Sequence, residues 1–174
     1  MARIAVLTVS DRASRGEYED RGGPAAEDWL RRVITSDIEI LRRIIPDGRA
    51  EVAAALVDLA DEWGADLILA TGGTGPGPRD LTPEAVADVI NMNLPGFGEA
   101  MRVANSRVVA TAILSRQGAG VRGRSLIITL PGSPNAIATS LEAIFAAVPY
   151  CLDLIGAARI DTDPAAIKAH RPKA

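Results

Sequence analysis

The feature that most constrains the fold of this chain is the alternation of short apolar runs with segments of helical periodicity. Residues 3–10, 38–45 and 66–71 are short runs rich in aliphatic and β-branched residues, which is typical of buried strands. Residues 24–36 and 50–63 instead place their apolar side chains at helical spacing. This alternation predicts an α/β fold in which helices cover both faces of a mostly parallel sheet.

The same alternation continues through the second half of the chain. Five more elements are predicted: a helix over 82–90, a helix after a loop within 93–108, strands over 108–115 and 124–130, and a helix that follows the turn at 131–133. Thr82 is expected to cap the first of these helices, and Ser133 the last. A length of 174 residues suits one domain. We therefore predict a single domain over residues 1–158 and a polar C-terminal tail over 159–174.

Composition excludes several classes of protein. A hydrophobic content of 48% provides a core, and a net charge of -3 argues against a nucleic-acid-binding surface. The single cysteine, Cys151, and the single histidine, His170, exclude a Cys/His zinc cluster and disfavour Ser–His or Cys–His catalysis. No apolar stretch approaches the ~20 residues of a membrane span, and no secretory signal is evident. We expect a cytoplasmic protein without a membrane partner.

The segment "ATGGTGPGPRDLTPEAV", residues 70–86, follows the predicted strand at 66–71. Its run Gly72-Gly73-Thr74-Gly75 permits positive φ and close approach of backbone N–H groups to an oxyanion. The run lacks the ending of a Walker A loop and does not fit the dinucleotide fingerprint. Two interpretations therefore stay open, a phosphate-binding nest and a tight connection between a strand and a helix.

Polar residues follow the other predicted strands as well. Asp47 and Asp80 each have a simple structural explanation, as a turn residue and as an acidic residue near a helix start. Together they form a pair of carboxylates suited to Mg²⁺, with substrate phosphates completing the coordination shell. The loops at 10–11 and 131–135 are expected at the same sheet edge, where ligands of such sheets bind. Arg116 ends an apolar run, where a guanidinium is able to bind phosphate.

Several segments resemble the molybdopterin adenylyltransferase family of molybdenum-cofactor biosynthesis. They are "TVSDRAS", "GGTGPGPRDLTPEA", "PGFGEAMR", "TAILSR", "SLIITLPGSPNA" and "VPYC". The resemblance runs from Arg3 to about Cys151 and implies a three-layer α/β/α sandwich. It also implies an enzyme that joins AMP from ATP to the terminal phosphate of molybdopterin, releases pyrophosphate and uses Mg²⁺.

The resemblance assigns roles to individual residues. The two essential aspartates of the family correspond to Asp47 and Asp80, which would hold Mg²⁺. The positions that match the molybdopterin side are Gly72, Gly73, Thr74, Gly75, Ser115 and Arg116. The positions that match the nucleotide side are Ser10, Asp11, Pro131, Gly132, Ser133, Pro134 and Asn135. Some bacterial members carry an insertion after "LPG" that this chain lacks, so the rim of its nucleotide pocket is expected to differ.

The resemblance further implies a homotrimer and a transient contact with the molybdate-insertion protein. The apolar segment Phe145–Leu154 is a candidate trimer contact, although its pattern fits a core segment equally well. The alternative function is a molybdopterin carrier or molybdate-insertion protein that transfers no AMP. Two strand-end carboxylates favour the enzyme, because a carrier has less need of them beside a bound phosphate. A scaffold module is a weaker third interpretation, since nothing is appended to the domain.

Overall fold

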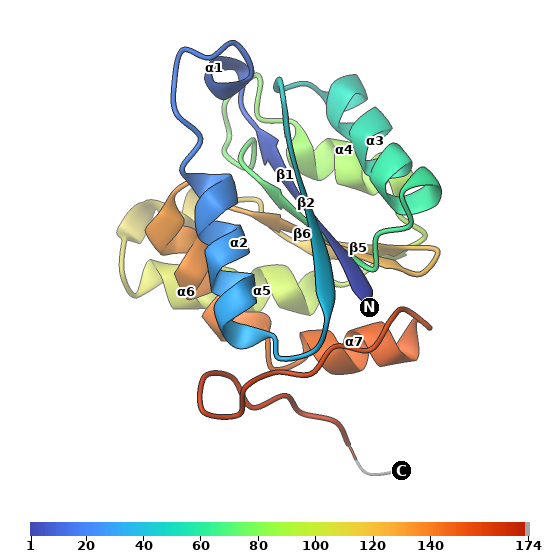
Figure 1. Ribbon diagram of the computed structural model, residues 1–174. Coiled ribbons are helices and arrows are strands. Elements are labelled where there is room, and N and C mark those ends of the chain that lie inside the picture. Colours follow the sequence, from blue (N-terminus) through green and yellow to red (C-terminus); the bar gives the residue numbers. More distant parts are fainter. Residues whose placement is uncertain (173–174) are drawn as a thin grey trace.

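The computed structural model describes residues 1–172 and contains one six-stranded sheet in the order β2-β1-β3-β6-β5-β4. Four neighbouring strands are parallel: β2 (Ile38–Ile45), β1 (Ala2–Val9), β3 (Leu67–Thr71) and β6 (Ser125–Leu130) (Figure 1). Two short strands, β5 (Ala119–Arg122) and β4 (Met92–Asn93), complete the sheet in antiparallel pairings. The predicted mostly parallel sheet is therefore confirmed.

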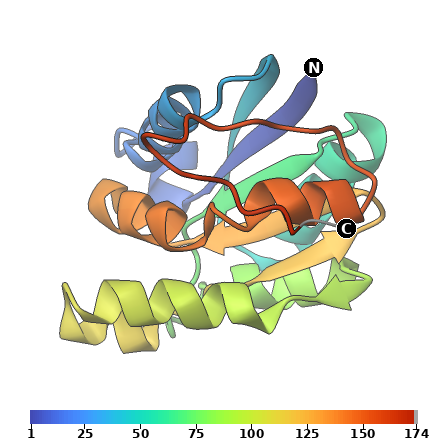
Figure 2. The same cartoon turned by 90° about the horizontal axis from the view of Figure 1, so that it is seen from below.

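Helices cover both faces of this sheet, so the predicted three-layer sandwich is also confirmed. One face carries α2 (Gly22–Val33), α5 (Pro95–Ser106), α6 (Pro134–Ile144) and α7 (Val148–Leu154). The other face carries α3 (Arg49–Val57), a π-helical turn (Asp58–Glu62) and α4 (Thr82–Val89). Helix α6 packs between α2 and α5, and α3 packs beside α4 (Figures 1 and 2).

The continuous apolar strands follow from this two-sided burial. In β1, Ile4 and Val6 belong to the core under α2 and α6, whereas Ala5 and Leu7 belong to the core under α3 and α4. All four are at most 1% exposed. A strand covered on both faces has no polar side, and its sequence therefore shows no alternation.

The prediction of a strand over residues 108–115 is wrong. This segment follows α5 and contains a 3₁₀-helical turn, Ala110–Leu114, whose apolar side chains lie largely at the surface. Val108 and Ile113 are each 75% exposed. The place beside β6 is taken instead by β5, which pairs with β6 through a turn at Gly123. Glycine and arginine residues in β5 weaken its strand signal.

One further detail differs from the sequence predictions. The helix at 82–90 begins with Leu81 as N-cap, and Thr82 lies inside its first turn.

The segment Phe145–Leu154 is core in part. Phe145, Val148 and Leu152 are 0% exposed, whereas Leu154 is 68% exposed. Of the two interpretations left open for this segment, the core interpretation therefore holds for its buried side chains.

The C-terminal segment packs against the domain although it forms no helix over residues 159–172. Ile160 is fully buried, Thr162 forms a β-bridge with Ile34, and Arg171 pairs with Asp153. The division at residue 158 stays a prediction, and residues 173–174 of the predicted tail lie outside the described part of the chain.

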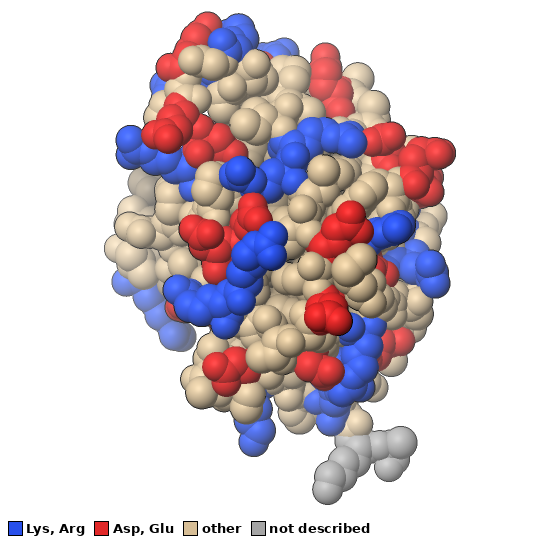
Figure 3. Space-filling model, in the orientation of Figure 1, with Lys and Arg blue, Asp and Glu red and all other residues tan. Residues whose placement is uncertain are grey.

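Charged side chains of both signs are interspersed on the face drawn in Figure 3. Among residues 1–172, no single helix is long and apolar enough to cross a membrane. Helices α6 and α7 reach that length and composition only together, and a bend of 62° separates them.

Candidate active site

The carboxyl ends of the parallel strands bring the polar loops to one edge of the sheet. The register aligns Val9 with Ile45, and it aligns Thr71 with both Thr8 and Leu130. The loops that follow β1, β2, β3 and β6 therefore begin side by side. The Thr71 hydroxyl donates to the Pro131 carbonyl at 2.7 Å and ties two of them together. This confirms the expected meeting of the four loops.

The segment between β3 and α4, residues 72–81, is called the glycine loop, and it is held tightly at its start. Gly72 and Gly73 have φ values of 98° and 63°, which favour glycine. The Gly72 N–H donates to the Leu130 carbonyl at 3.1 Å, and the Thr82 hydroxyl donates to the Gly72 carbonyl at 3.0 Å. A Cβ atom on Gly72 would lie 2.3 Å from the Val9 carbonyl oxygen. The two glycines are thus required by the tight connection itself, whether or not the loop also binds an anion.

Asp11 and Asp47 join the loops after β1 and β2 by a reciprocal pair of hydrogen bonds. The Asp11 N–H donates to Asp47 Oδ2 at 2.8 Å, and the Asp47 N–H donates to Asp11 Oδ1 at 3.1 Å. Arg79 from the glycine loop donates to both Asp11 carboxylate oxygens at 2.9 and 3.0 Å and to the Asp47 carbonyl at 2.6 Å. The hydrogen bond from Arg79 lowers the pKa of Asp11. Asp11, expected on the nucleotide side, serves here to hold three loops together.

The carboxylates of Asp47 and Asp80 form no ion pair with any residue in the range 1–172, where the neighbouring arginines pair with Asp11 and Glu84 instead. Asp47 Oδ1 lies beside Gly73, at 3.2 Å from the position that a Cβ atom would take there. Asp80 Oδ2 accepts the Gly77 N–H at 3.0 Å. Burial raises the pKa of Asp47, and the negative charges of Asp11 and Asp80 add to that shift, against a lowering by the Asp11 N–H. The two carboxylates therefore repel each other across one small site.

This donor set fits Mg²⁺. Hard cations take oxygen ligands, and Mg²⁺ is commonly held by one or two carboxylates together with substrate phosphates and water. Within the described residues, no group of three or more histidine, cysteine, aspartate and glutamate side chains is placed to hold a metal ion. Asp47 and Asp80 would supply part of the shell, and their mutual repulsion is the electrostatic condition that a cation relieves.

Replacing Asp47 with asparagine is expected to stabilise the fold. A raised carboxyl pKa means that ionisation of Asp47 opposes folding, so stability is lost as the pH rises from the ordinary value of 3.8 through the raised pKa. The asparagine carries no charge and still offers an oxygen to the Asp11 N–H. At pH 7 we expect Tm to rise by a few degrees at most. The gain is small because solvent screens a partly buried carboxylate.

The matched control is Asp61→Asn, since a hydrogen bond from Arg122 lowers the pKa of Asp61. That variant should not gain stability at pH 7. Thermal unfolding by circular dichroism at pH 7 and below pH 4 measures both variants. A lower Tm for Asp47→Asn at pH 7 would contradict the assignment of Asp47 as an electrostatically strained residue.

Ser115 and Arg116 contact the glycine loop from the side of α5. The Arg116 N–H donates to the Thr74 carbonyl at 2.8 Å, and the Ser115 and Thr74 hydroxyls are 3.4 Å apart. The Arg116 side chain reaches the Gly75 carbonyl, the Asp80 carbonyl and the Glu84 carboxylate. Its hydrogen bond lowers the pKa of Glu84. Arg116, expected on the molybdopterin side as a phosphate ligand, is thus directed at the loop.

Two hollows flank the glycine loop and meet at Gly132. The first, of about 360 Å³, is bordered by four predicted nucleotide-side or loop residues: Ser10, Gly72, Gly132 and Ser133. The second, of about 250 Å³, is bordered by Thr74, Gly75, Ser115, Pro131 and Gly132. Most residues of the two predicted groups therefore lie at one of two adjoining hollows. Five residues of the two groups border neither, although their chain neighbours do: Asp11, Gly73, Arg116, Pro134 and Asn135.

The first hollow has walls that sequence reasoning missed. They include Thr8, Arg12, Tyr18, Asp20 and Arg21. The Thr8 hydroxyl donates to Asp20 Oδ2 at 2.9 Å, and the Arg12 guanidinium lies 4.7 Å from the centre of the Tyr18 ring. The one sequence signal for these walls is the Gly22-Gly23 pair, which marks a close approach of the backbone. In the structure, a Cβ atom on Gly23 would lie 2.5 Å from Asp20 Oδ2.

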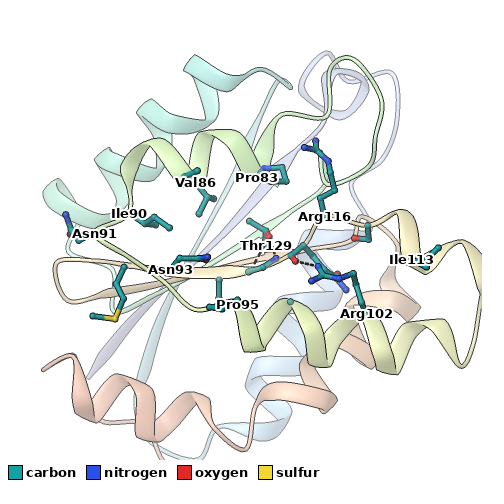
Figure 4. A pocket seen from close by; sticks show the side chains of 17 residues that line it. Pro83, Val86, Ile90, Asn91, Asn93, Pro95, Arg102, Ile113, Arg116 and Thr129 are labelled. Atoms are coloured by element: carbon teal, nitrogen blue, oxygen red, sulfur yellow. Dashed lines mark hydrogen bonds between the residues drawn. The ribbon is translucent and has the colours of Figure 1, made fainter.

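A third and larger hollow, of about 760 Å³, lies between α4 and α5 (Figure 4). At its border, Arg102 from α5 donates to the Gln117 carbonyl, which precedes β5, at 2.6 Å. Ser115 and Arg116 border this hollow as well, whereas Gly72–Gly75, Asp47 and Asp80 do not. Ser115 and Gln117 also border the second hollow, so the segment 115–117 lies between these two hollows.

Comparison with known proteins points to one family. Residues 5–150 match the family described as "Probable molybdopterin binding domain". A Helicobacter pylori protein named molybdopterin adenylyltransferase is 48% identical over 170 residues, which span 98% of this chain and 97% of that protein. An Escherichia coli K12 protein of the same name is 44% identical, and the match spans 98% of this chain and 94% of that protein.

Solved structures agree as well. The molybdopterin biosynthesis enzyme MoaB from Thermus thermophilus superposes with a TM-score of 0.81 at 42% identity, over 89% of this chain and 96% of that one. The molybdopterin biosynthesis Mog protein from Mycobacterium ulcerans gives a TM-score of 0.82 at 36% identity, over 89% and 99% of the two chains. With a family match over most of its length and relatives this similar, the chain belongs to the molybdopterin-binding domain family of molybdenum-cofactor biosynthesis proteins.

Proposed function

We propose that this protein is a molybdopterin adenylyltransferase, which transfers AMP from ATP to the terminal phosphate of molybdopterin and releases pyrophosphate. Relatives that are 44% and 48% identical over nearly the whole chain carry that name. The structural observation that carries the proposal is the pair Asp47 and Asp80. Both carboxylates lie without an ion-pair partner in the described chain. Neither borders a hollow itself, but Asp80 follows Gly72 and Gly75 in the loop that borders both hollows, and Asp47 binds the backbone of Asp11 between Ser10 and Arg12, which border the first.

The two hollows suit the two substrates. The hollow at Ser10, Gly72 and Ser133 would take the nucleotide, and the hollow at Thr74, Gly75 and Ser115 would take molybdopterin. Their common border at Gly132 would bring the terminal phosphate of molybdopterin to the α-phosphate of ATP. Backbone N–H groups of residues 73–75 are the proposed donors to phosphate oxygen, since the Gly72 N–H is already bonded to the Leu130 carbonyl.

The reaction needs no histidine. An ionised oxygen of the molybdopterin phosphate attacks the α-phosphorus and forms a new P–O bond. The bond between that phosphorus and the bridging oxygen breaks, and its electron pair leaves with pyrophosphate. Positioning and charge neutralisation dominate the catalysis of such transfers. Cys151 is unsuited to act as a nucleophile here, because burial raises the pKa of its thiol.

Asp47 and Asp80 are the residues that would hold Mg²⁺. When bound, the ion would neutralise charge on the phosphates. Arg79 would hold protein groups in place and would not contact the substrate, because its guanidinium is bound to the Asp11 carboxylate and to the Asp47 carbonyl. The arginine thereby keeps the Asp47 loop and the Asp80 loop at a constant separation.

The test is an assay of purified protein with molybdopterin and ATP in which pyrophosphate is measured. We expect pyrophosphate release that excess chelator abolishes and added Mg²⁺ restores. Full turnover in excess chelator would remove the metal-binding role from both aspartates. The alternative function, a carrier or molybdate-insertion protein, predicts binding of molybdopterin without pyrophosphate release. The names of the relatives and the two unpaired carboxylates do not favour it.

We further propose a cytoplasmic homotrimer that contacts the molybdate-insertion protein transiently. The segment Phe145–Leu154 offers only part of its side chains to a trimer contact, because Phe145, Val148 and Leu152 are buried in the core. A better candidate is the exposed apolar group at the end of α5 and in the following turn, made of Val103, Val108, Val109, Ile113 and Leu114. A monomer by light scattering at micromolar concentration would contradict the trimer.

A further inference from the structure

Arg116 directs its hydrogen-bond donors at the loop that carries Asp80. Its backbone N–H donates to the Thr74 carbonyl at 2.8 Å, and its Nε donates to the Gly75 carbonyl at 3.0 Å. Its two terminal nitrogens donate to the Asp80 carbonyl and to Glu84 in the first turn of α4. One residue thus contacts the start of the loop, its end, and the helix that follows.

The loop between these points has few other ties to the domain. Its internal hydrogen bonds are local: the Asp80 N–H donates to the Gly77 carbonyl, and the Gly77 N–H donates to Asp80 Oδ2, both at 3.0 Å. Arg79 ties it to the loops after β1 and β2, through Asp11 and the Asp47 carbonyl. Arg116 ties it to the opposite side, toward β5. Asp80 therefore sits between two arginine anchors.

The surroundings of Arg116 do not suit a phosphate ligand. Three of its side-chain donors already have acceptors, and the Glu84 carboxylate neutralises the guanidinium charge. A phosphate that bound the Arg116 guanidinium would have to displace the carbonyl oxygens that now accept from it. It would also approach the Glu84 carboxylate, which would repel it. The guanidinium side chain is 36% exposed, so most of it is enclosed by the loop and α4.

We infer that Arg116 is a positioning residue that holds the Asp80 loop in its active shape and does not bind substrate phosphate. This inference rests on the proposed AMP transfer for its kinetic consequence only. Its structural consequence, an ordered loop over residues 75–81, is independent of any activity. The two roles also require different chemistry at position 116. Lysine also binds phosphate, as a point charge, whereas the observed contacts to three acceptors require a planar fork with several donors.

Arg116→Lys separates the two roles, because lysine keeps the charge and loses the fork. Amide hydrogen exchange is measured by mass spectrometry on wild type, Arg116→Lys and Arg116→Gln without substrates. Single-turnover AMP transfer and molybdopterin KM are measured on the same proteins. We expect faster exchange over residues 75–81 in both variants. We also expect AMP transfer to slow by ~10–100-fold, the effect of a misplaced reactive group, with molybdopterin KM within about twofold of wild type.

Arg122→Gln is the matched control. Arg122 also binds a carboxylate and a backbone carbonyl, those of Asp61 and Val89, but lies away from the glycine loop. Its loss should leave exchange over 75–81 and the rate of transfer unchanged. If Arg116→Gln fails to fold, Glu84→Gln provides a second measurement, because it removes the outer anchor of Arg116 and should loosen the same peptide.

Wild-type exchange over 75–81 in Arg116→Lys would overturn the inference, and so would a molybdopterin KM raised by tenfold or more with normal exchange. Failure of the proposed function has a different signature. If the wild-type protein transfers no AMP, the exchange measurements still decide whether Arg116 orders the loop.

Discussion

Asp80→Asn is expected to slow AMP transfer by ~10²-fold or more while molybdopterin binding persists, since metal-assisted charge stabilisation is worth several kcal/mol. Asparagine has nearly the shape of aspartate, and its side-chain oxygen is able to accept the Gly77 N–H that Asp80 Oδ2 accepts. The loop should therefore keep its conformation. What the variant loses is the negative charge, which in wild type has no ion-pair partner in the described chain and is available to a cation.

Single-turnover transfer and molybdopterin affinity measured on the same protein test this expectation. Asp61→Asn is the control, because that carboxylate is at the surface, paired with Arg122, and remote from both hollows. A wild-type transfer rate for Asp80→Asn would show that Asp80 is only an acidic residue near the start of α4. An equal loss of molybdopterin affinity would show that its charge serves binding and not transfer.

Gly73→Val is expected to weaken molybdopterin binding and to destabilise the fold by ~1–3 kcal/mol, the cost of a strained backbone position. Gly73 has a φ of 63°, which a β-branched residue resists. A Cβ atom there would also lie 2.3 Å from the Thr82 hydroxyl and 3.2 Å from Asp47 Oδ1. The added side chain would therefore displace the anchor of the glycine loop and one proposed metal ligand together.

Gly123→Val separates the backbone cost from the steric cost. Gly123 has a φ of 55°, but a Cβ atom there would meet nothing within 4 Å. Both variants should lose stability, whereas Gly73→Val alone should lose molybdopterin affinity and AMP transfer. Molybdopterin titration and thermal unfolding of the two proteins give the comparison. Equal affinities would indicate that the glycines serve only the tight connection after β3.

The sequence predicted most of the central sheet because its signals are local. A strand buried on both faces is largely apolar, so β1, β3 and β6 are recognisable from short runs, as is the β-branched run of β2. The glycine loop is equally local, since positive φ at Gly72 and Gly73 demands glycine. The same reasoning explains the wrong strand prediction at residues 108–115. An apolar run predicts a buried strand, but the large apolar side chains of this run lie at the surface.

The sequence by itself thus determined the fold class, the edge of the sheet at which the polar loops meet, and the candidacy of Asp47 and Asp80 as metal ligands. Only the tertiary structure decided how the charges pair. Arg79 binds Asp11, which is 68 residues away in the chain, and Arg116 binds the Asp80 carbonyl, 36 residues away. Such pairs form between loops that meet only after the strands have packed in the order β2-β1-β3-β6. A local pattern identifies an arginine, but which acceptor its fork meets depends on long-range packing.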